Sequence, residues 1–151
     1  MSETIIYNGY ELPPFQAPAY GYTSTVTHRG VTYVSGHVPK TGAHDLHPGK
    51  VGKDVTLEQA QAAAKLALMN ALSTLNQAIG GLDNVERFLK ITVFVASAEN
   101  FNQQPKVADA ATNLLRDIFA ERGEHARSAV GVAELPRNSS VEIELIVAVN
   151  A

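Results

Sequence analysis

The chain contains no cysteine among its 151 residues. This absence excludes disulfides, thiol nucleophiles and thiolate metal ligands, and it leaves the redox compartment undetermined. No apolar run approaches the roughly 18 to 20 residues of a membrane span, and the N-terminus lacks the basic and apolar regions of a secretory signal. We therefore expect a cytoplasmic protein with no membrane partner.

Excess positive charge is also lacking, because 12 basic side chains face 15 acidic ones and the formal charge is −3. No net field draws the chain to phosphate backbones, so nucleic acid is disfavoured as a partner, although a local basic patch is not excluded. The hydrophobic share of 45% is typical of a globular protein, and the length fits one domain. We predict a single domain over residues 1–151, with 1–22 as a lead-in loop punctuated by Asn8-Gly9 and Pro13-Pro14.

The first regular structure expected is a hairpin. Residues 24–28 and 31–35 are rich in β-branched side chains and are separated by Arg29-Gly30. Residues 36–54 carry glycine, proline and histidine without any period. They predict a surface loop.

Two helices are predicted further along the chain. Thr56 and Gln59 have the spacing of a capping box, and apolar residues then keep a helical period over residues 57–79. After Pro105 a second helical period runs to Gly123. Both patterns are typical of amphipathic helices that pack on a sheet.

Three further strands are expected at residues 88–97, 127–133 and 141–149, because apolar and β-branched residues alternate there. The resulting order, ββαβαββ, predicts an α+β domain with a mixed sheet. Two helices can cover only one face of such a sheet.

The residues of the last two strands divide into faces. In the first of them Val130 and Val132 share one side, while Arg127 and Ala129 share the other. We expect the aliphatic rows to lie under the helices, which would place Arg127 and Glu142 together on the uncovered face. That face would also be too apolar to remain in water, so we infer that it packs against other subunits.

The residues now point to a family. Residues 126–136, Ala-Arg-Ser-Ala-Val-Gly-Val-Ala-Glu-Leu-Pro, and 141–144, Val-Glu-Ile-Glu, closely resemble the C-terminal signature of the YjgF/Rid (reactive intermediate deaminase) family. Residues 33–39 resemble the strand-turn segment of this family that ends in Ser-Gly-Gln-x-Pro. The resemblance implies a chorismate-mutase-like fold and a homotrimer with a barrel-like core and clefts between subunits. In length the chain resembles the branch labelled endoribonuclease L-PSP.

The same resemblance implies roles for individual residues. Arg127 matches the arginine that holds a substrate carboxylate, and Glu142 matches the carboxylate that positions or activates water. The other positions that it assigns to the substrate cleft are Tyr22, Ser35, Gly36, His37, Asn113 and Ala129. No cofactor and no metal are implied.

The implied chemistry is the hydrolysis of reactive 2-enamine or 2-imine acids, such as 2-aminoacrylate, to 2-oxo acids and ammonia. A planar guanidinium grips a carboxylate through charged hydrogen bonds of about 1.5 to 3 kcal/mol each. Because an imine is already electrophilic, the protein need only orient water and move protons, which typically adds roughly 10² to 10⁴-fold. One carboxylate could suffice for that step.

The chain departs from the family pattern at three positions. His37 stands where glutamine is usual, Ala129 where many members have cysteine, and His125 where a proline often precedes the Ala-Arg pair. The chain is also longer around residues 41–53 and 99–106. These departures bear on the choice of substrate more than on the fold.

Each residue also has a purely structural alternative. Arg127 could pair with Glu142 or Glu144 across strands or subunits, and only one of these glutamates need be functional. Ser35 has no positioned histidine and aspartate, which favours a hydrogen-bonding role over a nucleophilic one. Tyr22 could pack rather than line a site.

Alternatives exist for the function as well. The His44-Asp45-x-His47 segment contains residue types that bind metals. It lies in a glycine-rich loop without a rigid helix or strand, however, and such loops are usually solvated and bind no metal. A trimer that binds small carboxylic metabolites without turnover, or that acts like a chaperone, would use the same cleft. The third hypothesis is an RNA-cleaving translation inhibitor, which the charge of the chain does not support.

Overall fold

A five-stranded mixed sheet forms the centre of the protein, in a computed structural model that describes residues 4–150. Its strands are β3 (Thr25–His28), β4 (Val31–His37), β7 (Val85–Ala96), β8 (Ala126–Val132) and β9 (Val141–Val149). They lie in the order β3-β4-β9-β7-β8. Only β7 and β8 run parallel, and the other neighbours are antiparallel. The predicted ββαβαββ order is confirmed.

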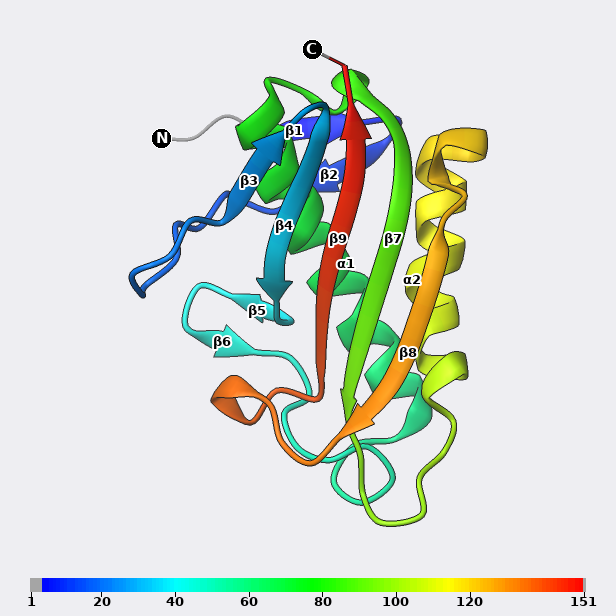
Figure 1. The fold of residues 1–151 in the computed structure, drawn as a ribbon. Helices are drawn as coiled ribbons and strands as arrows, with labels where there is room; N and C mark the ends of the chain where they lie inside the picture. Colours follow the sequence, from blue (N-terminus) through cyan, green and yellow to red (C-terminus); the bar gives the residue numbers. More distant parts are fainter. Residues whose placement is uncertain (1–3, 151) are drawn as a thin grey trace.

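Two helices, α1 (Leu57–Ile79) and α2 (Gln104–Phe119), cover one face of this sheet, as predicted (Figure 1). α1 begins at the predicted capping box, in which Gln59 N donates to Thr56 Oγ1 over 3.1 Å and Thr56 N donates to Gln59 Oε1 over 3.0 Å. It ends at Gly80, which adopts a φ of +77°. α2 carries Pro105 in its first turn, where the missing N–H costs nothing. No helix in residues 4–150 is long and apolar enough to cross a membrane.

Short elements lie where the sequence predicted loops. The lead-in segment contains a hairpin of β1 (Ile5–Tyr7) and β2 (Tyr10–Leu12), so the prediction of a loop over residues 1–22 was wrong there; residues 1–3 lie outside the described residues. Asn8 and Gly9 have φ values of +50° and +85°, which is the tight-turn geometry that an Asn-Gly pair favours. The predicted surface loop contains a second small hairpin, β5 (Lys40–Thr41) and β6 (His44–Asp45). The remaining elements are the 3₁₀ turns η1 (Leu82–Asn84), η2 (Ala120–Gly123) and η3 (Pro136–Asn138).

The core lies between the helices and the sheet. β9 alternates regularly along its length, and its odd-numbered residues from Val141 to Val149 are buried. β7 begins at Val85, three residues earlier than the predicted start. The ring of Phe88 on this strand packs edge-on against the ring of Phe119, and the two ring centroids are 4.8 Å apart. These aliphatic rows account for the position of the sheet under α1 and α2.

The faces of β8 differ from the prediction. Phe94 of β7 is in register with Glu142 on one side and with Val130 on the other, so these three side chains share the uncovered face. Ile91, which is buried under the helices, is in register with Arg127. Arg127 and Glu142 therefore lie on opposite faces, and the prediction that they share one was wrong. β8 is an edge strand beside α2, where a polar side chain can face the helix and still reach water.

The uncovered face carries several exposed apolar side chains. Val26, Tyr33 and Val130 are 55%, 51% and 41% exposed, and Phe94 and Ile146 are in register with residues of the same rows. Figure 1 shows this face free of any helix along the full length of β7 and β9. An exposed apolar surface that spans several strands is typical of an interaction face.

Candidate active site

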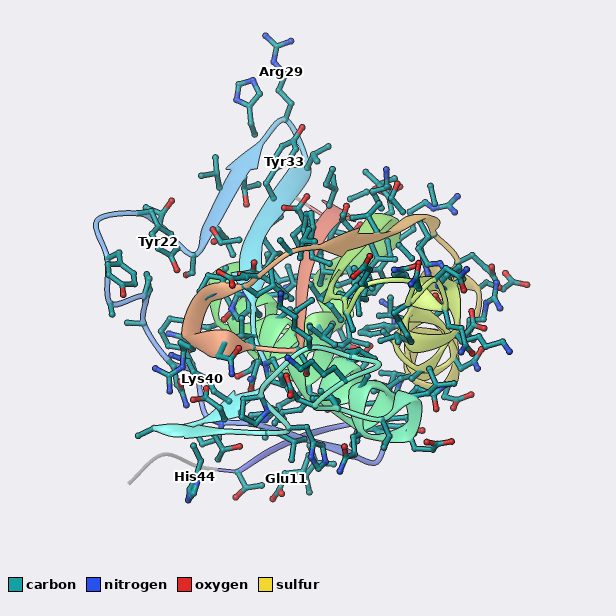
Figure 2. The ribbon with its side chains drawn as sticks, turned by 90° about the horizontal axis from the view of Figure 1, so that it is seen from below. Glu11, Tyr22, Arg29, Tyr33, Lys40 and His44 are labelled. Carbon is teal, nitrogen blue, oxygen red and sulfur yellow. The ribbon has the colours of Figure 1, made fainter. Side chains whose placement is uncertain are left out.

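A cavity of about 490 Å³ opens at the end of β4. It lies between residues 14–22 of the lead-in segment, the start of the second hairpin, α1 and η3. Five of the residues predicted to form the site line it together: Tyr22, Ser35, Gly36, His37 and Glu142. Figure 2 shows Tyr22 on the long N-terminal loop, which borders the cavity on its outer side.

A β-bulge brings Gly36 against Glu142. Val34 is in register with Leu145 and His37 with Ile143, so β4 carries one extra residue between these pairs. A methyl group at position 36 would lie 2.7 Å from Glu142 Oε2 and 2.9 Å from its Cδ. The absence of a side chain at Gly36 therefore makes room for the Glu142 carboxylate.

The environment of Glu142 favours its protonated form. The side chain is half-buried, and burial raises the pKa of the carboxyl group above its ordinary value, with the nearby Glu144 adding to the shift. A carboxyl group whose pKa moves toward neutrality can exchange protons in both directions during a reaction. This is the property expected of a group that handles water and a leaving amine.

Replacing Gly36 with alanine is expected to lower activity at this site about tenfold or more, because the new methyl group displaces the Glu142 carboxylate by the few tenths of an ångström that positioning tolerates poorly. The fold should be retained, since Gly36 does not require a positive φ. The measurement is kcat/KM together with Tm.

Gly21→Ala is the matched control for this substitution, because a methyl group there meets nothing within 4 Å and Gly21 also lacks a positive φ. Equal activities of the two alanine variants would show that the contact between Gly36 and Glu142 has no functional role.

Ser35 and His37 are held by hydrogen bonds. Ser35 Oγ donates to the carbonyl of Thr23 over 2.9 Å, so its hydroxyl proton is committed to the backbone. His37 Nδ1 lies 2.7 Å from the Ser35 carbonyl, and its Nε2 lies 2.8 Å from Thr74 Oγ1. Burial lowers the pKa of His37, so the neutral ring donates from Nδ1 and accepts at Nε2. Both residues thus shape the bulge, and neither is free to act as a base.

Arg127 lies in a second cluster, on the helix side of β8. Its Nη1 donates to Asp109 Oδ1 over 2.9 Å and to Thr112 Oγ1 over 3.1 Å. The side chain is 24% exposed. Within residues 4–150 these bonds use only Nη1, so the edge formed by Nε and Nη2 remains available to a carboxylate.

His125 completes this second cluster. Its Nδ1 lies 2.6 Å from the Gly123 carbonyl and its Nε2 lies 3.0 Å from Thr112 Oγ1. The carbonyl requires a proton on Nδ1, so Nε2 accepts from the threonine hydroxyl when the ring is neutral. Burial lowers the pKa of His125 and favours that neutral form, and the adjacent cations Arg116 and Arg127 act in the same direction. Thr112 thereby links His125 to the guanidinium.

Asn113 does not belong to either cluster. It lies on the exposed side of α2, where it lines a shallow hollow with Asp109 and Asp117, and the side chain that contacts Arg127 is its neighbour Thr112. Asn113 does not line the Glu142 cavity, and its assignment to the substrate cleft stays a prediction. Ala129, by contrast, lies two residues beyond Arg127 on the same side of β8 and packs against the core.

One chain keeps the two clusters apart. Val130 and Glu142 are both in register with Phe94, so they lie at the same level of the sheet. Arg127 is three residues from Val130 along β8, which is about 10 Å at the usual rise per residue. Two strand spacings add about 10 Å across the sheet, and the side chains point to opposite faces. A single molecule cannot bring Arg127 and Glu142 to one ligand.

The histidine-rich segment considered for metal binding serves another purpose. Arg137 Nε and Nη2 donate to the two carboxylate oxygens of Asp45 over 2.7 and 3.1 Å. This pairing occupies the carboxylate between His44 and His47. No group of three or more potential ligands gathers anywhere in residues 4–150.

The polar residues that support the two clusters were not predicted from the sequence. Thr74 and Asn70 lie on α1, Thr112 lies on α2, Lys40 lies on β5 and Arg137 on η3. A small polar residue on the buried side of an amphipathic helix was the signal that could have revealed Thr74 and Thr112, which are 2% and 7% exposed. No sequence signal links Arg137 to the cavity, because its partner lies 92 residues away.

Comparisons with known proteins agree with this fold. A profile of the family described as Endoribonuclease L-PSP matches residues 15–149. The protein TCP17 of Trypanosoma cruzi is 39% identical over 94% of this chain and 89% of its own length. A crystal structure from Shewanella oneidensis superposes with a TM-score of 0.89 at 29% identity and covers 93% of both chains. The shared architecture is the chorismate-mutase-like α+β fold.

A shorter match concerns an enzyme of known reaction type. The 2-iminobutanoate/2-iminopropanoate deaminase of Dermatophagoides farinae is 41% identical over 61 residues, which cover 40% of this chain and 41% of that protein. The family represented by the profile thus includes imine deaminases.

Proposed function

We propose that this chain, which belongs to the YjgF/Rid family, hydrolyses 2-imino acids to 2-oxo acids and ammonia at sites shared between neighbouring subunits. Each site would combine the Glu142 cavity of one subunit with the Arg127 cluster of the next. The reaction adds water across the C=N bond of R–C(=NH)–COOH and gives R–CO–COOH and NH₃, so no cofactor is required.

The observation that carries this proposal is the division of the chemistry between two faces. Glu142 lies half-buried in the cavity, and the pKa of its carboxyl group is raised. Arg127 lies elsewhere on the same chain, and its Nε and Nη2 donate no hydrogen bond within residues 4–150. Glu142 can transfer protons but cannot bind an anion, whereas Arg127 can bind an anion but does not transfer protons. An assembly that repeats the chain around a closed ring would join them at every interface.

In the proposed mechanism Arg127 holds the carboxylate of the imine and Glu142 faces its C2 carbon. In the first step ionised Glu142 takes a proton from water as the oxygen attacks C2, and it passes this proton to the imine nitrogen. In the second step Glu142 takes the proton of the carbinolamine hydroxyl and returns it to the nitrogen, so that the C=O bond forms, the C–N bond breaks and ammonia leaves. The Ser35–Gly36 bulge keeps the carboxylate in position for both steps. Such proton transfer typically contributes roughly 10² to 10⁴-fold.

The assembly that we propose is a homotrimer whose sheets line a barrel. Its support is the apolar face around Val26, Tyr33 and Val130, which a second copy of the chain would remove from water. Sedimentation equilibrium of the purified protein measures this directly. A monomeric mass would contradict the shared site, because one chain keeps Arg127 and Glu142 apart.

The function is tested by adding the purified protein to an amino-acid oxidase or a dehydratase that releases 2-imino acids, with semicarbazide present to trap the imine that escapes. Faster loss of the imine than in buffer, with a matching rise in the 2-oxo acid, is the expected result. Imine lifetimes that do not change would refute the proposal and leave a binding role. A parallel incubation with RNA, repeated across sizing-column fractions, tests for the endoribonuclease activity that the family description names.

A further inference from the structure

The residues that line the cavity include two cationic side chains and one carboxylate. Lys40 of β5 and Arg137 of η3 both line it, whereas Glu142 on β9 is the carboxylate that lines it. Figure 2 shows Lys40 and Tyr22 on the same side of the molecule, with the N-terminal loop beside them. Two cations in one cavity indicate an anionic ligand, unless each is already paired.

Arg137 is paired and Lys40 is not. Lys40 and Asp45 are cross-strand partners in the small hairpin, so Asp45 is the carboxylate best placed to neutralise the lysine. Asp45 instead binds Arg137 through both of its oxygens. Lys40 makes no ion pair with any residue of the range 4–150. The group of Lys40, Arg137 and Asp45 therefore retains one positive charge.

The backbone around Lys40 is fixed, which distinguishes it from an ordinary surface lysine. Asn70 of α1 donates to the carbonyl of Val38 over 3.0 Å and to that of Lys40 over 2.9 Å. Arg137 is held at a φ of +62° with its Nη2 donating to the Ala43 carbonyl over 3.2 Å. These bonds fix the backbone of Lys40 and the guanidinium of Arg137 beside the cavity.

The volume of the cavity also exceeds the needs of a three-carbon acid. At about 490 Å³ it falls within the roughly 300 to 1,000 Å³ of pockets that enclose drug-sized ligands. A substrate with a longer side chain would extend from Glu142 toward Lys40. The single net positive charge there matches one carboxylate better than a phosphate, whose charge is about −1.5 to −2.

We propose that Lys40, with Arg137 beside it, binds a second carboxylate at the end of the substrate side chain, and that dicarboxylic 2-imino acids are the preferred substrates. This inference rests on the proposed function, in which Arg127 of the neighbouring subunit binds the first carboxylate and Glu142 acts at the imine. The reaction is unchanged: water replaces the imine nitrogen, ammonia leaves, and the distal carboxylate takes no part in any bond.

The test compares two imines of equal chain length, generated by an amino-acid oxidase from 2-aminoadipate and from norleucine. The wild-type protein should hydrolyse the imine from 2-aminoadipate with the higher kcat/KM. Lys40→Met keeps the length of the side chain and removes its charge, and it should lower that value about tenfold, in line with the loss of one charge-assisted hydrogen bond. Its kcat/KM for the norleucine imine should not change. Lys53→Met, at an exposed lysine that does not line the cavity, is the control.

Equal rates on the two imines, or an equal loss on both in Lys40→Met, would overturn this inference while the deaminase function stands. If the wild-type protein hydrolyses neither imine, the deaminase function itself is contradicted. Calorimetric titration with 2-oxoadipate decides the inference in that case, because it needs no turnover. Weaker binding to Lys40→Met than to Lys53→Met would support a distal carboxylate site, and equal binding would refute it.

Discussion

Arg127→Ala is expected to lower kcat/KM for imine hydrolysis by about 10² to 10⁴-fold, because two charged hydrogen bonds of about 1.5 to 3 kcal/mol each to the substrate carboxylate are lost. Arg127→Lys should restore little of this, since an ammonium group cannot reproduce the planar fork. The effect on Tm should be small. The ion pair with Asp109 is partly exposed to solvent and such pairs contribute about 0 to 1 kcal/mol.

The matched control for Arg127 is Arg116→Ala. Arg116 makes a similar ion pair with Glu124 at 3.1 Å, and both side chains are about half exposed, but its hydrogen bond goes to Glu124 and not to Arg127, Thr112 or His125. Its loss should leave turnover unchanged. If the two alanine variants have the same activity, Arg127 is a structural residue and the proposed carboxylate clamp is wrong.

Mixing of subunits extends this prediction. Arg127→Ala and Glu142→Gln chains damage different halves of each shared site, so each variant should be inactive alone. When the two are unfolded together and refolded at equal concentrations, about a quarter of the sites should carry both intact halves and regain activity, since a ring interface takes one half from each neighbour. If the mixture assembles normally but regains no activity, Arg127 and Glu142 of different subunits do not form one site. That result would contradict the shared site.

Glu142→Gln is the second substitution with a large expected effect. It should lower kcat by roughly 10² to 10⁴-fold, because the amide can neither take a proton from water nor return it to the leaving amine. The same change should raise Tm at neutral pH. The folded state raises the pKa of Glu142 above its ordinary value of 4.5, so ionising this half-buried group opposes folding.

The pH dependence of this stabilisation follows from the direction of the shift. Below pH 4.5 the carboxyl group is protonated in both the folded and the unfolded chain, and the two proteins should have similar Tm values. As the pH rises through the raised pKa of the folded state, wild type loses stability relative to Glu142→Gln. Thermal unfolding of both proteins between pH 4 and pH 8 measures the divergence, and parallel curves would show that Glu142 is not perturbed.

Glu144→Gln is the control for Glu142. Glu144 is exposed and contributes only the secondary cause of the Glu142 shift. Its replacement should keep most of the turnover and move the acidic limb of the pH–rate profile to lower pH, because a nearby negative charge no longer opposes ionisation of Glu142. Loss of activity as complete as in Glu142→Gln would assign the proton-transfer role to Glu144 instead.

The fold could be predicted largely from the sequence because its signals are local. The capping box at Thr56, the helical period that follows it, and the alternation of residues along β9 each depend on neighbours within a few positions. The two short hairpins were missed because strands of two or three residues carry no period. The Asn8-Gly9 turn was the one signal that could have revealed the first of them.

The site was only partly predictable, and the errors have specific causes. Alternation along β8 correctly separated Arg127 from Val130, but nothing in the strand itself says which side faces a helix. The register with β7, through Ile91 and Phe94, decides that question. Likewise, the family resemblance pointed to Asn113 on α2, whereas the α2 side chains that bind Arg127 are Asp109 and Thr112, and only the packing of α2 against β8 brings them there.

The sequence by itself determined the family and the order of the elements, because both follow from motifs and periodic patterns that are local in the chain. It also supplied Arg127 and Glu142 as the candidate charged groups. Tertiary structure alone decided that these groups lie on opposite faces of the sheet. It also decided that Gly36 makes room for Glu142, and that Asp45 binds Arg137 and leaves Lys40 without an ion-pair partner among residues 4–150. The physical reason is that strand register, a bulge and a contact across 92 residues are products of packing, which no local pattern encodes.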